Sequence, residues 1–122
     1  MSPSQNTPEL LQGTLDVMIL SVLKNGPMHG YAIARQIERS SGGDLSIEEG
    51  SLYPALHRLS KRGDLDAAWS ETDTGRRARF YTLSRQGQKK LVEQTSLWQR
   101  VSTAVNSVLA AGPNATAPEG SR

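Results

Sequence analysis

The fold is decided by the stretch Gly50-Ser51-Leu52-Tyr53-Pro54-Ala55-Leu56-His57-Arg58-Leu59-Ser60-Lys61-Arg62-Gly63. On a helical wheel at about 100° per residue, its leucines fall within one narrow arc. The opposite side carries Pro54, His57, Arg58 and Lys61. The stretch therefore predicts an amphipathic helix with one side for a core and one side for an anionic partner.

Both ends of this helix are marked in the sequence. Proline lacks an N–H and is comfortable only in the first turn, so Pro54 predicts a start with Ser51 as the N-cap. Gly63 follows the last leucine, where a left-handed residue is favoured, and Lys61 and Arg62 complement the dipole of the last turn.

Two helices and a short strand are predicted before this stretch. Residues 14–24 are apolar at nearly every angle, which is typical of a helix buried on most sides, and Asn25-Gly26-Pro27 ends it. Residues 30–40 have one apolar side and one charged side. Residues 45–47 alternate like a short strand.

Tyr31 falls on the polar side of the second helix, in its first turn. Its hydroxyl can donate to a phosphate beside the helix N-terminal amides, or its ring can cover the edge of the core. Both interpretations stay open. His29, just before it, is interpreted as a capping or packing residue.

A basic hairpin is predicted after the amphipathic helix. Residues 65–70 alternate and residues 78–83 are rich in strand formers, so the two segments pair around a tip at 71–75. Arg76 and Arg77 follow the glycine of the turn. Two adjacent arginines at a hairpin tip favour contact with a nucleic-acid backbone or minor groove.

The last helix is predicted to run from residue 84 or 85 to about 110. Apolar residues repeat along it with heptad spacing, at Leu91, Trp98, Val101, Val105 and Val108. Gln94 is the polar exception in this pattern. In a chain this short, the same helix of a second copy is the simplest cover for such a seam, so we expect a homodimer.

Composition limits the remaining possibilities. The chain has 122 residues, which suits one domain, and it has no cysteine and two histidines, so no metal site or other cofactor is expected. Residues 50–90 hold nine basic and four acidic residues, a local excess that favours a polyanionic partner. The chain shows no phosphate loop and no nucleophile elbow, so an enzyme is not expected.

The ends of the chain are polar and contain prolines. Residues 1–9 and 111–122 are predicted to be disordered, and the start shows neither a signal peptide nor an apolar run long enough to span a membrane. We therefore expect a soluble, cytoplasmic protein that has no membrane partner.

Together these elements predict a mainly α fold with a small β-hairpin. The order ααβαββ is that of a winged helix-turn-helix, here at residues 10–84, with a long dimerisation helix at 85–110. In such a fold the third helix enters the major groove of double-stranded DNA and the hairpin, or wing, touches the flanking backbone.

The chain resembles the PadR-like transcriptional regulators over roughly residues 10–110. The matching blocks are Gly13–Leu20, Gly26–Tyr31, Gly50–Leu59, Gly75–Tyr81 and Leu83–Gly87. The resemblance implies a dimeric, usually repressing, DNA-binding protein that dimerises through a single C-terminal helix. Asp64 departs from the family, which usually has an apolar residue there, and this predicts that the first wing strand begins one residue later.

The predicted roles of the DNA-binding residues follow from their chemistry. Ser51, Pro54, His57, Arg58 and Lys61 are assigned to base edges in the major groove. Tyr53 flanks that face and either bonds a phosphate or packs under the helix. Arg76, Arg77 and Arg79 are assigned to the backbone and minor groove, although for Arg79 a merely solvated position fits nearly as well. Two copies call for a palindromic operator.

Trp98 has two interpretations. A tryptophan in the middle of a dimer helix is usually a packing residue. In PadR-like regulators that sense drugs, a tryptophan in the corresponding helix stacks on planar aromatic ligands, so the resemblance makes Trp98 a candidate effector contact. Two alternatives to a sequence-specific regulator remain, a winged helix that binds proteins and a loosely specific architectural DNA binder.

Overall fold

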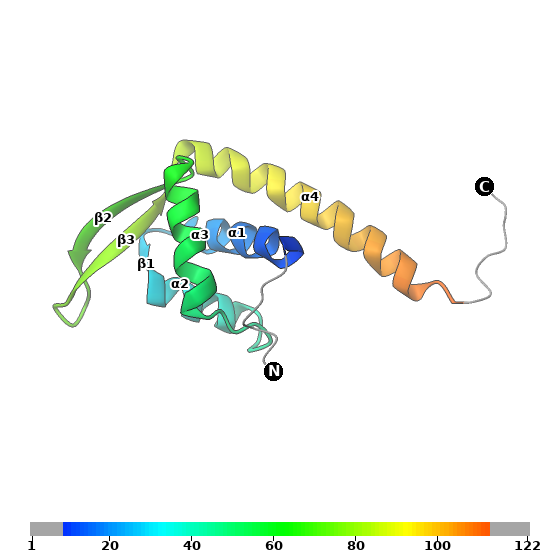
Figure 1. Cartoon of the computed structure of the whole chain (residues 1–122), viewed down its shortest axis with the longest axis horizontal. Coiled ribbons are helices and arrows are strands. Elements are labelled where there is room, and N and C mark those ends of the chain that lie inside the picture. The colour runs from blue at the N-terminus through cyan, green and yellow to red at the C-terminus, as the bar shows by residue number, and fades with distance from the viewer. Residues whose placement is uncertain (1–8, 113–122) are drawn as a thin grey trace.

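Four helices and a three-stranded sheet form the molecule (Figure 1). The structure is a computed structural model and describes residues 9–112. The elements are α1 (Glu9–Leu23), β1 (Met28–His29), α2 (Gly30–Ser40), α3 (Glu49–Lys61), β2 (Leu65–Glu71), β3 (Arg77–Leu83) and α4 (Arg85–Ala110). The mainly α fold, the hairpin and the long C-terminal helix are confirmed. The disorder predicted for residues 1–9 is wrong at Glu9, which begins α1, and the rest of that segment and residues 113–122 of the tail predicted for 111–122 lie outside the described residues.

The core forms around α1. Ile19 and Leu20 have no exposed surface, because α2, α3 and α4 all pack against this helix. From α3 the core receives Leu52, Leu56 and Leu59, the three leucines of the predicted apolar arc. The pattern along α1 is therefore that of a helix with neighbours on several sides.

The position of the short strand differs from the expectation. Residues 45–47 form no strand, and the third strand is β1, which pairs with β3 through Met28↔Tyr81 and His29↔Phe80. The sheet order is β1-β3-β2, so β3 offers its second edge to the segment between α1 and α2. Residues 45–47 do not join the sheet, in which β3 pairs with β1 on one edge and with β2 on the other; Ile47 instead packs against the core.

Two helices begin earlier than predicted. The first starts at Glu9 rather than at residue 14, since residues 9–12 are good helix formers and the helix continues through Gly13. The third starts at Glu49, so Ser51 is not its N-cap; the carbonyl of Glu48 accepts the amides of Ser51 and Leu52 at 3.0 and 2.9 Å.

Pro54 therefore lies in the second turn of α3 rather than the first. It has no N–H to offer to the carbonyl of Gly50. Both residues are exposed, so water can reach the Gly50 carbonyl, and the helix continues past Pro54.

The end of α3 follows the sequence signal. Gly63 has φ 88°, its amide donates to Ser60 at 3.1 Å, and the next amide, of Asp64, donates to Leu59 at 3.0 Å. These two bonds form a Schellman motif, which needs a left-handed residue at Gly63. The first wing strand then begins at Leu65, one residue after Asp64, as predicted.

A tight junction joins the end of α3 to the start of α4. The Ser84 hydroxyl accepts the amide of Gly87 at 3.0 Å, which caps α4, and donates to the carbonyl of Gly63 at 2.6 Å. The Gln86 amide donates to the Asp64 carboxylate at 2.7 Å. A side chain at Gly87 would collide with the Asp64 carbonyl, so glycine lets the two segments touch.

The second half of α4 extends away from the domain. Figure 1 shows α4 passing alongside α1 and continuing beyond its end. Exposed apolar side chains line this helix: Val92, Leu97, Trp98, Val101, Val105, Val108 and Leu109. In the part of the chain that the structure describes, no helix is long and apolar enough to span a membrane.

Candidate nucleic-acid interface

The outward face of α3 carries three of the predicted base-reading residues. Pro54, His57 and Lys61 are exposed, and they recur at spacings of three and four, which places them on one side of the helix. The leucines behind them are fully buried and fix the orientation of this side. The structure thus presents a row of one apolar and two polar side chains to solvent.

Arg58 faces a different direction. Its Nη2 donates to Asp16 Oδ1 on α1 at 2.6 Å, and Arg62 donates to Asp16 Oδ2 at 3.2 Å. Ser51 lies on this flank of α3 too, seven residues before Arg58, and is only partly exposed. The base-reading role predicted for Arg58 therefore meets a competing partner within the protein, because its cationic end is already held by a carboxylate.

Tyr53 lies on the opposite flank of α3, where the helix approaches the start of α2. A Cβ added at Gly30 would lie 2.8 Å from the Tyr53 ring carbon Cε1, so glycine leaves the space that the ring occupies. Burial, followed by the nearby Glu49 charge, raises the pKa of Tyr53 above its ordinary value. The hydroxyl therefore stays protonated near neutral pH and can donate. The ring is 43% exposed and lies beside Gly30 of α2 rather than under α3, and the predicted phosphate contact stays a prediction.

His29 and Tyr31 form an aromatic pair at the N-terminus of α2. The Nδ1 of His29 accepts the Ala32 amide at 3.3 Å, so this histidine caps the helix, and its ring meets Phe80 edge-on at 5.3 Å. The Tyr31 ring is parallel to that of His29, with centroids 6.5 Å apart. Tyr31 is 58% exposed, so it does not cover the core edge, and its hydroxyl accepts from Arg35 at 2.9 Å.

The tip of the wing is a compact turn. The Gly75 amide donates to the Thr72 carbonyl at 2.9 Å, and the Thr72 amide donates to the Arg76 carbonyl at 2.8 Å. Gly75 has φ 85°, the left-handed residue that closes such a hairpin. The turn places the exposed Arg76 and Arg77 at the start of β3, as the sequence predicts.

The Trp69 ring lies beside two arginines of the wing. Trp69 on β2 pairs directly with Arg79 on β3, and Glu71 pairs with Arg77. The guanidinium carbons of Arg77 and Arg79 lie 5.2 and 6.0 Å from the centroid of the Trp69 ring. Arg79 is thus on the same face of the wing as Trp69 and Arg77, rather than on an unrelated solvated face.

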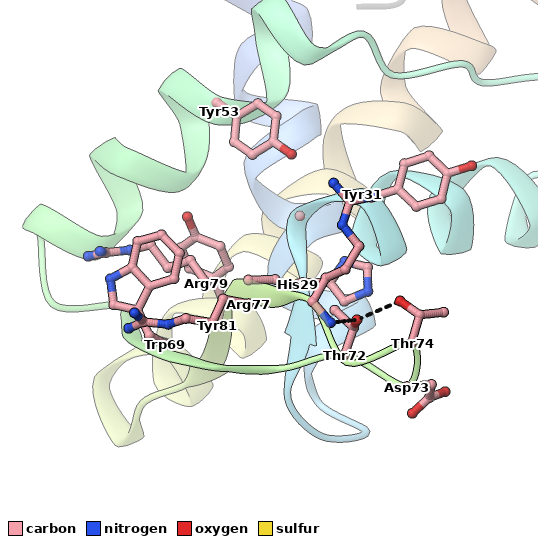
Figure 2. A pocket seen from close by; sticks show the side chains of 13 residues that line it. His29, Tyr31, Tyr53, Trp69, Thr72, Asp73, Thr74, Arg77, Arg79 and Tyr81 are labelled. Carbon is pink, nitrogen blue, oxygen red and sulfur yellow. Dashed lines mark hydrogen bonds between the residues drawn. The ribbon is translucent and has the colours of Figure 1, made fainter.

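These elements enclose one cleft of about 790 Å³. It is lined by His29, Gly30, Tyr31, Tyr53, Trp69, Thr72, Asp73, Thr74, Arg76, Arg77, Ala78, Arg79 and Tyr81. Figure 2 shows Tyr53 approaching from α3 on one side and Trp69, Arg77 and Arg79 from the wing on the other. The cleft combines three cations with hydroxyl donors and aromatic faces, which suits a sugar-phosphate backbone.

Two residues of this surface were missed by sequence reasoning. Trp69 alternates with Leu65 and Ala67, a pattern that indicated a strand but not which arginines would meet the ring. Asp16 is an isolated acid among apolar residues of α1, and an isolated charge in a buried helix indicates a partner. That signal was present in the sequence, although the partner's identity was not.

The predicted dimer face has two parts in the structure. Leu91 packs partly against the core, whereas Trp98, Val101, Val105 and Val108 are between 38% and 72% exposed. Leu109, four residues after Val105, extends the same side and was missed. A groove of about 140 Å³ between α1 and α4 includes Trp98 and Val101 in its lining.

Comparison with known proteins gives a consistent picture. The family model "Transcriptional regulator PadR-like family" matches residues 19–93. A padR family transcriptional regulator from Eggerthella lenta is 29% identical, with TM-score 0.69 over 85% of this chain and 88% of its own. A transcriptional regulator from Clostridium thermocellum is 27% identical, with TM-score 0.73 over 82% and 97%. A PadR-like regulator from Bacillus cereus is 26% identical, with TM-score 0.71 over 86% and 100%.

Proposed function

Because the chain belongs to the PadR-like family of transcriptional regulators, we propose that it binds a specific duplex sequence as a homodimer and represses transcription there. Membership in the family makes it a DNA-binding regulator rather than an enzyme. The observation that supports the finer proposal is the cleft, which lies between the Tyr53 flank of α3 and the cationic wing, beside the exposed row of Pro54, His57 and Lys61. We expect it to act in the cytoplasm.

In this proposal α3 reads the major groove. His57 can hydrogen-bond to a base edge, Lys61 can contact guanine acceptors, and Pro54 offers apolar contact to a thymine methyl. All three are exposed on one side of the helix. Arg58 and Ser51, on the flank toward α1, are assigned to the edge of the contact, with Arg58 serving first as the partner of Asp16.

The wing and the starts of α2 and α3 hold the DNA backbone. Arg76, Arg77 and Arg79 supply three cations on one side of the cleft. Tyr53 and Tyr31 supply hydroxyls on the other side, of which the Tyr31 hydroxyl already accepts from Arg35 and so keeps its proton free to donate. These contacts set affinity and salt dependence rather than sequence choice.

Dimerisation through α4 is proposed from the exposure of its apolar side. Trp98 is 45% exposed and Val105 is 48% exposed on a helix that continues past the domain. An isolated helical segment of that kind is marginal in water, and a second copy of α4 covers it. The twofold pair would place its α3 helices in successive major grooves, about 34–36 Å apart, on a palindromic operator.

Trp98 is also the candidate contact for a planar aromatic effector that releases the DNA. What favours it is its position in the largely apolar groove between α1 and α4, beside Val17 and Leu97. Titration of flat aromatic compounds should quench the Trp98 emission in a Trp69→Phe background. Unchanged emission across a broad panel would leave packing as its role.

The test of the proposal is selection of preferred duplexes from a random pool by the purified full chain. Enrichment of an inverted repeat with half-sites one helical turn apart supports a sequence-specific dimer. Binding without enrichment would favour a loosely specific architectural protein. Failure to bind any duplex would favour a winged helix that contacts proteins.

A further inference from the structure

Trp69 is an exposed tryptophan on the wing that no role so far explains. Its side chain is 57% exposed, although burying so large an aromatic side chain would be strongly stabilising. It shares its face of the wing with Leu65, which is buried at the other end of β2. That face leaves the core and continues outward, so its outer end lines the cleft.

The arginines around Trp69 are arranged by the strand register. Arg79 lies directly across from Trp69, and Arg77 is its diagonal neighbour. Cross-strand neighbours at these positions are within reach of an aromatic side chain. Both guanidinium groups lie within about 6 Å of the ring centroid, the range of cation–π attraction.

The ring therefore restricts two long side chains that would otherwise sample many rotamers. An arginine side chain has substantial conformational entropy, and ordering it before binding lowers the entropy cost of binding. Figure 2 shows the Trp69 ring beside Arg77 and Arg79, across the cleft from Tyr53. The indole also has an N–H donor and an apolar edge of its own.

We propose that Trp69 is a DNA-contacting residue of the wing, which holds Arg77 and Arg79 in place and packs against the sugar-phosphate backbone that enters the cleft. This inference rests on the proposed DNA-binding function and adds a neutral residue to it. The partner it implies is a deoxyribose-phosphate strand, contacted without regard to base sequence.

The test compares Trp69→Leu with Trp69→Phe. Loss of the ring removes its contact with the strand and the order that it imposes on both arginines, so Trp69→Leu should weaken binding roughly 5- to 30-fold, on specific and random duplexes alike. Phenylalanine keeps a ring and should recover most of the loss. Ser70→Leu, which places a leucine on the other face of the same strand, is the matched control and should leave binding unchanged.

A second measurement detects contact directly. The chain has two tryptophans, so 5-fluorotryptophan labelling gives two fluorine NMR signals, and the Trp69→Phe protein assigns them. The Trp69 signal should move when duplex is added. The inference is overturned if wild-type protein binds duplex while the Trp69 signal stays in place, or if Trp69→Leu binds as tightly as wild type. Absence of any binding by wild-type protein would instead reject the proposed function.

Discussion

The Asp16 carboxylate on α1 lies 2.6 Å from the Arg58 guanidinium on α3. Its second oxygen lies 3.2 Å from Arg62, one turn further along the same helix. Asp16 is only 18% exposed, whereas the two arginines are 38% and 50% exposed. One carboxylate therefore joins the C-terminal half of α3 to α1 and pairs with two cations beside the side of α3 that we propose faces DNA.

Replacing Asp16 should loosen that attachment. Asp16→Asn should lower the free energy of unfolding by about 1 kcal/mol, a value reduced because the arginines are partly solvated. It should also raise affinity for random duplex, since two cations are released and one anion is lost. Denaturant titration and binding to random DNA measure the two effects. Glu38→Gln, which breaks an exposed pair of 3.7 Å with Arg35, should change neither. If the affinity for random DNA does not change, Asp16 does not compete with DNA phosphates for Arg58 and Arg62.

Removing the arginines at the wing tip should change the salt dependence of binding. In the proposed dimer, Arg76→Ala combined with Arg77→Ala should reduce the slope of log K against log salt by about 3.6, because two phosphate contacts are lost from each protomer and each contact contributes about 0.9. Specific and random duplexes should lose affinity to a similar extent. Arg39→Ala, at an exposed position outside the cleft lining, is the control. A slope that does not move would show that the wing tip makes no phosphate contacts.

His57 should affect sequence choice rather than overall affinity. His57→Ala removes an exposed hydrogen-bonding side chain from the middle of α3, so base preference near the centre of a half-site should relax, by about 1–3 kcal/mol of discrimination. Repeating the duplex selection with this variant measures it. Selection of the same sequence with the same stringency would remove His57 from the reading face.

Gly30 should be required for the position of the Tyr53 ring. In Gly30→Ala the new methyl would lie 2.8 Å from Tyr53 Cε1 and displace the exposed ring rather than the backbone. DNA binding should weaken severalfold, with little change in thermal stability. In a Tyr53→Ala background the same substitution should have no further effect, because coupled residues are not additive. Additive losses would show that Gly30 acts by another route.

A charge on the apolar side of α4 should produce monomers. Val105→Glu places a carboxylate on the side that also carries Trp98, and a buried unpaired charge is strongly unfavourable at an interface. Sedimentation should show a single protomer, and affinity for a palindrome should fall to that for a half-site. Thr103→Glu, on the opposite side of the helix, should remain dimeric. A dimeric Val105→Glu protein would place the interface elsewhere.

Local signals predicted the helices, the hairpin and their faces well, because these depend on spacing along one element. The leucines of α3, the turn at Gly75 and the cap at His29 are of this kind. The starts of α1 and α3 were predicted too late, and the remaining errors concern partners distant in sequence. Nothing near residues 45–47 shows that the edge of β3 pairs with β1 instead. The sequence around Arg58 does not show that its guanidinium pairs with Asp16 of α1, which is 42 residues away in the chain.

The junction at Ser84, Gly87 and Asp64 leaves no hinge between α4 and the wing domain. In a pair of protomers joined through α4, each α4 and its winged-helix domain would move as one rigid body about the contact between the two α4 helices. A change in the crossing angle of the two α4 helices would therefore increase or decrease the distance between the two α3 helices. In the proposed dimer, the spacing between operator half-sites would thus be set at the contact between the two α4 helices, away from the bases that α3 reads.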